Sequence, residues 1–167
     1  MGRLLLIAVP VLPAAGCSKP SPLPNSAEDA LQRGTNFRLI SLEPEPREDE
    51  LAKSEKTWHH NNEWIVLGET AITKSATRSK IVTAIKAAVR ESDGSAASCF
   101  WPRHAISVVH NGKTHEFEIC FKCLQMSQMS WKIEGKRQDT ILIGENQKVA
   151  SDAVLEEGGV KLARPGN

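Results

Sequence analysis

The chain has 167 residues, of which 40% are hydrophobic and 25% charged, and its formal net charge is +1 at pH 7. Removal of the leader described below, which contains Arg3, leaves 20 of the 21 Lys and Arg residues against 20 Asp and Glu residues, a balance of zero. This neutral balance argues against a nucleic-acid-binding protein, which needs a basic face to displace counterions from phosphate, and no polybasic patch for anionic lipid is evident either.

Residues 1–16 predict a signal peptide of the lipoprotein type. Arg3 precedes a run of nine apolar residues, which is too short for a membrane-spanning helix of about 20 residues but suits an export signal. Small residues then lead to Cys17, where such a signal is cleaved and lipid is attached. Ala14 stands three residues before the cysteine, where Leu is usual. The alternative is ordinary signal cleavage near Gly16, which would leave Cys17 as a plain thiol.

A lipid on Cys17 would anchor the exported protein in a membrane of the cell envelope, on the periplasmic face. Several acyl chains hold a protein firmly at a membrane, whereas one chain binds only marginally. Ser18 follows the cysteine instead of Asp, which weakly favours the outer membrane of a two-membrane bacterium. The expected partners are therefore the membrane, through the N-terminal lipid, and an unidentified envelope protein, with no nucleic acid.

Residues 17–34 are predicted to connect the lipidated cysteine to the domain. Residues 18–25 contain three prolines and no aromatic residue, which is typical of an extended tether. A turn of helix is expected at residues 27–33. Residues 35–167 then form a single domain, long enough for one hydrophobic core.

The sequence of the first half of this domain predicts two strands and one helix. Alternation of apolar and polar residues predicts a strand at residues 37–42, and a second strand is expected at 63–70. The segment between them, 43–56, is charged and contains prolines, which indicates a surface loop. Apolar residues spaced three and four apart predict an amphipathic helix over Ser75–Glu91, with Asp93-Gly94 as its stop.

The second half contains a hairpin signal. Asn111-Gly112 separates two alternating runs, 105–110 and 113–120, and both central residues of a type I′ turn need positive φ. Further elements are expected at 124–133 and 140–143 as strands and at 151–157 as a short helix. The fold class is therefore α+β: an antiparallel sheet with a central Asn-Gly hairpin and one main amphipathic helix on one face.

The register of this hairpin gathers the downstream cysteines. A two-residue turn pairs His110 with Lys113, which places Arg103 opposite Cys120 and brings Cys99 within one step of Cys123. Because side chains alternate along a strand, one face is expected to be apolar and the other to face solvent. The apolar face would carry His104, Ile106, Val108, Phe117, Ile119, Phe121 and Cys123. The solvent face would carry Ser107, Thr114, Glu116, Glu118 and Cys120.

Three interpretations of Cys99, His104, Cys120 and Cys123 compete, taken in order of preference. The first is a structural disulfide from Cys99 to Cys123 or Cys120, which exported domains often use and which would contribute about 3 kcal/mol for a loop of about 20 residues. An odd number of thiols then leaves one unpaired, and Cys120 is the candidate because it points away from Cys123 in a regular strand.

The second interpretation is a tetrahedral zinc site made of all four side chains. Residues three apart on a strand face opposite sides, so Cys120 and Cys123 could share a metal only if the chain turned between them. The third is a redox-active Cys120-x-x-Cys123 pair. That chemistry usually sits at a helix N-terminus, which lowers a thiol pKa, whereas a strand is expected here. Arg103, beside this cluster, could bind a carboxylate bidentately.

The cysteine motifs resemble a pattern in small exported proteins and lipoproteins of Planctomycetes-type bacteria, an uncharacterised family. The matching residues are Cys99-Phe-Trp-Pro-Arg-His-Ala-Ile106, then Gly112-Lys113-Thr114, then Ile119-Cys-Phe-Lys-Cys123. The strand and helix from Val66 to Gly94 and the tail Asp152-Ala-Val-Leu155 are similar as well. The resemblance implies that the cysteines, Arg103 and His104 act as a unit, and it brings no activity with it.

The expected function is a membrane-anchored envelope module that acts by binding or assembly, with a structural Cys/His cluster. No G-x-S-x-G, P-loop or H-E-x-x-H motif occurs, so nothing favours a hydrolase or a nucleotide enzyme, and no cofactor is expected. The alternative is a zinc-binding or thiol-redox protein that uses Cys99, His104, Cys120 and Cys123 chemically.

Overall fold

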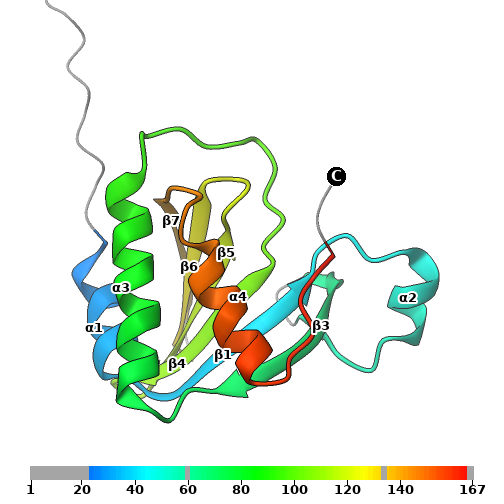
Figure 1. The fold of residues 1–167 in the computed structure, drawn as a ribbon, viewed down its shortest axis with the longest axis horizontal. Helices are drawn as coiled ribbons and strands as arrows, with labels where there is room; N and C mark the ends of the chain where they lie inside the picture. The colour runs from blue at the N-terminus through cyan, green and yellow to red at the C-terminus, as the bar shows by residue number, and fades with distance from the viewer. Residues whose placement is uncertain (1–22, 59–60, 133–134, 165–167) are drawn as a thin grey trace, which may run out of the picture.

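The computed structural model describes residues 23–58, 61–132 and 135–164, which form a seven-stranded antiparallel sheet and four helices (Figure 1). The helices are α1 (Asn25–Arg33), α2 (Glu48–Lys53), α3 (Ser75–Glu91) and α4 (Lys148–Glu157). The strands are β1 (Thr35–Glu43), β2 (Thr57–Trp58), β3 (Asn61–Ala71), β4 (His104–His110), β5 (Lys113–Cys120), β6 (Gln125–Lys132) and β7 (Gly135–Leu142). Their order in the sheet is β2-β3-β1-β4-β5-β6-β7. The predicted mixture of helices with an antiparallel sheet is confirmed.

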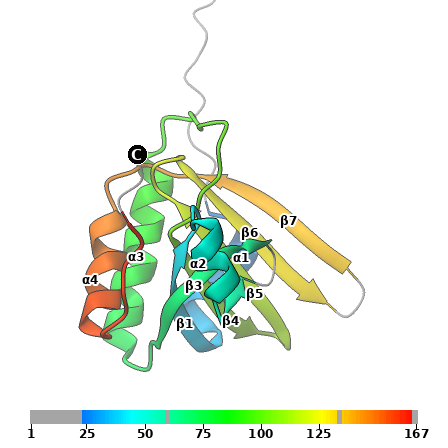
Figure 2. The ribbon, with the colours of Figure 1, turned by 90° about the vertical axis from the view of Figure 1, so that its right-hand side faces the viewer.

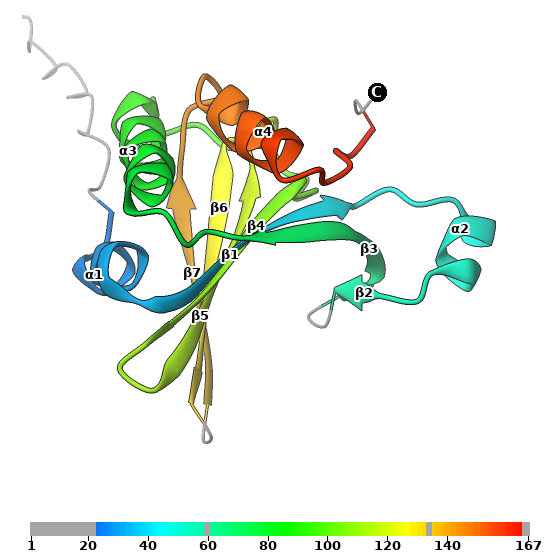
Figure 3. The same cartoon turned by 60° about the horizontal axis from the view of Figure 1, so that its bottom comes forward.

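Three helices, not one, pack on the main apolar face of the sheet. In Figure 3, α3 and α4 lie over the strands, with α1 beside α3. The short helices contribute few but fully buried side chains, such as Leu31 of α1 and Leu155 of α4, both with 0% exposure. Leu23 is also buried in this core. The packed region therefore includes α1, which lies within the predicted tether, residues 17–34.

The opposite face of the sheet is covered as well, because the sheet curls. Trp58 on β2 donates its indole N–H to Oε1 of Glu118 on β5 at 2.6 Å, although three strands separate β2 from β5 in the sheet order. Neighbouring strands lie about 4.8 Å apart, so a flat sheet could not bring these residues together. Glu116 and Glu118 are only 3% and 1% exposed, and the expectation that both face solvent is wrong.

The β4–β5 hairpin places its two ends in different surroundings. Asn111 and Gly112 form the turn with φ values of 51° and 69°, and His110 lies opposite Lys113. At the other end, β5 stops at Cys120 and β6 begins at Gln125, directly opposite. The short turn between them, residues 121–124, lies beside the loop that leads from α3 into β4, and these two segments build the candidate site.

The described helices include none with the length and apolar character that crossing a bilayer requires. The remaining helix, α2, stands apart from the other three (Figure 1), next to β3, and Figure 2 is viewed from its side, so that α2 lies in front of the sheet.

Candidate functional site

A sharp turn at the end of β5 brings Cys120 and Cys123 together as a disulfide. The turn contains neither Gly nor Pro, and Leu124 completes it with a φ of 58°, a conformation uncommon for a residue with a side chain. The sequence pattern predicts a regular strand here, with Cys120 pointing away from Cys123. That expectation is wrong, and so is the preferred pairing of Cys99 with Cys123 or Cys120, because the chain reverses within these four residues.

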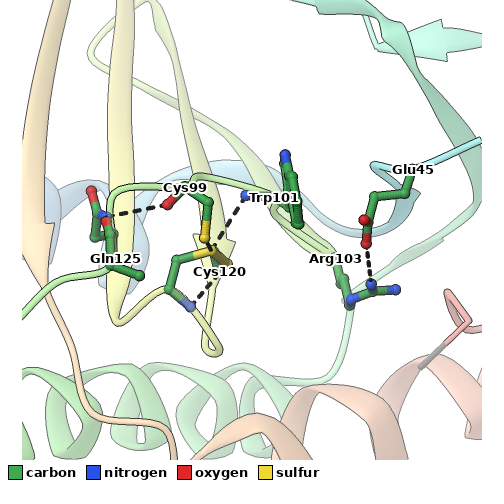
Figure 4. The surroundings of a disulfide bond; sticks show 8 residues. Glu45, Cys99, Trp101, Arg103, Cys120 and Gln125 are labelled. Carbon is green, nitrogen blue, oxygen red and sulfur yellow. Dashed lines mark hydrogen bonds and ion pairs between the residues drawn. A yellow bond between two sulfur atoms is a disulfide. The ribbon is translucent and has the colours of Figure 1, made fainter. Parts of the chain in front are cut away.

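The remaining thiol is Cys99, and its loop is fastened directly to this turn. The Ala97 N–H donates to the Cys123 carbonyl at 3.0 Å. The Gln125 side-chain amide donates to the carbonyl oxygens of Ala97, at 2.5 Å, and of Cys99, at 3.4 Å. As a result the Cys99 Sγ lies 3.9 Å from the Cys123 Sγ (Figure 4). The structure thus gathers the three downstream cysteines, with Cys99 as the free one.

Backbone amides point at both sulfur atoms of the disulfide. The Cys123 N–H donates to the Cys120 Sγ at 3.1 Å, and the Trp101 N–H donates to the Cys123 Sγ at 3.4 Å. Donors in these positions favour a thiolate over a thiol if the bond opens. Cys120 and Cys123 are only 3% and 1% exposed, whereas Cys99 is partly exposed. A partner in solution therefore has easiest access to Cys99.

His104 lies next to the cysteines on β4 but has a partner of its own. Its Nε2 is 2.7 Å from Oδ1 of Asp152 on α4, and Lys148 contacts the other carboxylate oxygen. Burial alone would raise the pKa of Asp152, but the hydrogen bonds from His104 and Lys148 outweigh it and hold that pKa below its usual range. The imidazole is 2% exposed, and its Nδ1 has no hydrogen-bond partner within the described ranges.

The predicted zinc set of Cys99, His104, Cys120 and Cys123 is not assembled as four ligands. Two of the sulfur atoms are bonded to each other and the His104 Nε2 faces Asp152. Within the part of the chain that the structure describes, no group of three or more His, Cys, Asp or Glu side chains is arranged to hold a metal ion.

A pocket of about 450 Å³ opens at this cluster. Three cysteines, several apolar side chains and four cationic side chains line it, together with the indole of Trp101, which is 44% exposed. The lining residues are Glu45, Cys99, Trp101, Arg103, His104, Cys120, Phe121, Lys122, Cys123, Lys148, Leu162, Ala163 and Arg164. A cavity of this size and mostly apolar character is typical of a ligand or peptide side-chain site.

Arg103, the expected anion-binding residue, lies in the wall of this pocket with its guanidinium engaged internally. It pairs with Glu45 at 3.1 Å and donates to the carbonyl of Arg164. Arg164 in turn pairs with Glu43 at 3.2 Å and with Glu50 at 2.9 Å. These contacts hold the chain after α4 against the pocket and complete its wall.

Sequence reasoning missed the residues that complete this site from a distance. Asp152 on α4 bonds to His104 and is held in turn by Lys148, and Arg164, the last described residue, lines the pocket. No local pattern signals the contacts of His104 with Asp152 and of Arg103 with Arg164, because these partners are 48 and 61 residues apart in the chain. Only the tail that begins at Asp152, which belongs to the family resemblance, indicated that this region matters.

No family model matches this chain, and the searches of curated proteins and of solved structures also find no similar protein. Cys17 and residues 1–16, predicted to be a signal peptide, lie outside the described residues.

Proposed function

We propose that this protein is a lipid-anchored protein of the bacterial envelope that exchanges a disulfide with the thiols of a partner. The observation that carries the proposal is the 3.9 Å separation between the free Cys99 Sγ and the Cys123 Sγ of the Cys120–Cys123 disulfide. The envelope is an oxidising compartment in which disulfides persist. The anchor on Cys17 follows from the leader sequence.

The proposed reaction begins inside the cluster. Cys99 loses its proton to solvent, and its thiolate attacks the Cys123 Sγ. The Cys99–Cys123 bond forms, the Cys120–Cys123 bond breaks, and the electron pair remains on the Cys120 sulfur. The Cys123 N–H, 3.1 Å from that sulfur, stabilises the leaving thiolate, and a thiolate that leaves easily makes exchange faster.

The second stage involves a partner that carries two thiols. One partner thiolate attacks the Cys99 Sγ and releases Cys123 as a thiolate. This step leaves a mixed disulfide between the partner and Cys99. The second partner thiolate then attacks the partner sulfur of that mixed disulfide and releases Cys99 as a thiolate. Overall, the partner dithiol is oxidised to a disulfide, and Cys120 and Cys123 are reduced to two thiols, which take their protons from solvent. The pocket of about 450 Å³ beside Cys99 provides room for the partner segment.

A second candidate function is a binding or assembly module in which the disulfide is purely structural. The low exposure of Cys120 and Cys123 favours it, because a sulfur atom that solvent does not reach exchanges slowly. In that case the pocket would bind its ligand or partner segment without sulfur chemistry. The two candidates differ in what Cys99 does.

The test measures how fast the Cys120–Cys123 disulfide is reduced by glutathione. The exported, mature protein is purified in detergent, mixed with glutathione, quenched with acid at intervals, alkylated and mapped by peptide mass. Wild type is compared with Cys99→Ser and with the matched control Ser98→Ala, at the exposed neighbouring position. Exchange through Cys99 predicts a reduction at least tenfold slower in Cys99→Ser, an unchanged rate in Ser98→Ala, and a glutathione adduct on Cys99 in wild type.

Equal rates in all three proteins would overturn the exchange function and leave the structural module. Three alkylatable thiols, together with stoichiometric zinc retained through a purification without chelator, would instead support the zinc-binding alternative.

A further inference from the structure

A second pocket, of about 640 Å³, lies between α1 and α3, away from the cysteines. Four cationic side chains line it, Lys74, Arg78, Lys86 and Arg90, and the described lining residues include no carboxylate. They stand at multiples of four positions on and just before α3, so neighbouring members lie close together along a row that winds gradually around the helix. We refer to this pocket as the α3 groove. The cations are dispersed in the sequence, which is why no polybasic stretch is visible there.

Few of these charges are neutralised by carboxylates. Glu28 on α1 pairs with Lys86 at 2.5 Å, and the hydrogen bond from Lys86 lowers the pKa of Glu28. Arg78 donates only to backbone carbonyls of α1 and the following residue. Lys74 and Arg90 are exposed and have no ion-pair partner within the described ranges. The groove therefore retains a clear positive excess although the mature chain is neutral.

The groove also lies where the chain arrives from the expected lipid anchor. The Glu28–Lys86 pair fixes the first turn of α1 beside the C-terminal half of α3. Only eight positions separate Cys17 from Asn25, the first residue of α1. A fully extended chain of eight residues spans at most about 28 Å, so an acyl chain on Cys17 would hold this face near the bilayer surface.

We propose that the α3 groove is a contact surface for the anionic phospholipid headgroups of the membrane that carries the anchor. This inference rests on the lipid anchor of the proposed function but not on its disulfide chemistry. Headgroup phosphates complement the cations of the groove, and attraction between Lys or Arg and anionic lipid acts within a Debye length of about 8–10 Å. The tether, with a reach of at most about 28 Å, lets the domain come within this range, and the groove determines which face it presents.

The experiment uses the lipidated protein in vesicles of phosphatidylcholine, with or without phosphatidylglycerol. A water-soluble amine reagent labels the lysines, and peptide mass spectrometry measures the labelling rate of Lys86 in the groove. Lys53 on α2, whose side chain is 78% exposed, is the internal control. We expect Lys86 to be labelled at least threefold more slowly on anionic than on neutral vesicles, with the difference abolished in 0.5 M salt, and Lys53 to be labelled equally on both.

Two double variants, each with two positive charges removed, distinguish an effect of the groove from an effect of the protein's net charge. Lys74→Gln with Arg90→Gln should abolish the protection of Lys86, whereas Lys53→Gln with Lys161→Gln should retain it. Equal labelling of Lys86 on both vesicles in wild type, or protection that survives in the groove variant, would overturn the proposal. Protection of Lys86 by the anionic polysaccharide polygalacturonate, with no protection on vesicles, would also overturn it and would indicate that the groove binds an anionic polymer.

Flotation of the vesicles tests the anchor separately. A protein that floats with neutral vesicles but shows no protection of Lys86 has the anchor and lacks the headgroup contact. A protein that floats only with anionic vesicles and is protected there has the contact without the anchor. A protein that floats with neither overturns both.

Discussion

The Nε2 atom of His104 lies 2.7 Å from Oδ1 of Asp152, so one partly buried hydrogen bond joins the first residue of β4 to the middle of α4. This bond fixes α4 over the sheet and holds one wall of the cysteine pocket. It also connects two segments that are 48 residues apart, and its loss should affect both stability and the pocket.

Asp152→Asn should lower the free energy of unfolding by about 1–3 kcal/mol, because it replaces a charged hydrogen-bond partner of a buried imidazole by a neutral one. Denaturant unfolding followed by circular dichroism measures the change. Glu156→Gln, on the exposed side of the same helix, is the control and should change stability by less than about 0.5 kcal/mol. An Asp152→Asn protein as stable as wild type would show that the pair is not stabilising.

The same pair predicts a dependence of stability on pH. Because the folded-state pKa of Asp152 lies below its usual value, the carboxylate stabilises the fold fully above the unfolded pKa of about 4. The contribution is lost as the pH falls through the lower folded pKa. The difference in stability between wild type and Asp152→Asn should therefore be constant from pH 5 to 7 and shrink below pH 4. A difference that grows on acidification would contradict the assignment.

Cys120→Ser should move the disulfide to Cys99 and Cys123, whose sulfur atoms are already 3.9 Å apart. After treatment with oxidised glutathione, intact mass should show the loss of two hydrogens, and peptide mapping should show Cys99 joined to Cys123. Cys99→Ser should keep the Cys120–Cys123 bond under the same conditions. If Cys99 and Cys123 both remain alkylatable in the oxidised Cys120→Ser protein, the cluster cannot relay a disulfide.

Arg78→Met should destabilise the protein by about 2–3 kcal/mol. Arg78 donates to the carbonyl oxygens of Ala30, Leu31 and Gly34 at 3.2, 2.7 and 2.6 Å. The Ala30 carbonyl also accepts the Gly34 N–H at 2.9 Å, but the carbonyls of Leu31, in the last turn of α1, and of Gly34, just after it, would lose this donor. Bonds from a charged donor are worth more than neutral ones. Chemical denaturation provides the measurement, with Lys80→Met, at an exposed position of α3, as the control. Equal stability of the two variants would mean that water replaces the guanidinium without cost.

Gly34→Ala should cost about 1–3 kcal/mol because of crowding rather than backbone strain. A Cβ at this position would lie 2.4 Å from Cγ2 of Val108 and 2.7 Å from the Ala30 carbonyl oxygen. The chain here passes from α1 into β1 in close contact with β4. Thermal unfolding would detect the loss, and Gln32→Ala on the exposed side of α1 should remain within about 0.5 kcal/mol of wild type. An unchanged melting temperature for Gly34→Ala would show that Val108 moves freely aside.

Local signals predict the elements of this fold better than their packing. Asn111-Gly112 marks a turn because its conformation is decided by the two residues themselves, and the spacing of apolar residues marks α3 for a similar reason. Glu116 and Glu118 alternate with apolar residues as solvent-facing side chains do, yet the curl of the sheet buries them, with Trp58 bonded to Glu118. Curvature arises from the whole sheet, so no local pattern shows it.

The cysteine site is predicted in its location but not in its bonding. The hairpin register brings Cys99 to the end of β5, where the structure has it. The pairing depends on Leu124, which adopts a left-handed conformation without being Gly or Asn, and the sequence offers no sign of this. The contacts of His104 and Arg103 come from segments far along the chain, which a reading of neighbouring residues cannot supply.

The Cys120–Cys123 bond joins residues only three positions apart. Closing so short a loop restricts the unfolded chain little, by about 2 kcal/mol on the loop-length relation, against about 3.5 kcal/mol for a bond from Cys99 to Cys123. The ring that this bond closes contains only residues 120–123, and the rest of the protein lies outside it. Opening the Cys120–Cys123 bond is therefore expected to cost about 1.5 kcal/mol less stability than opening a bond from Cys99 to Cys123 would. The proposed exchange thus places its two-electron change at the position where the fold loses less by it.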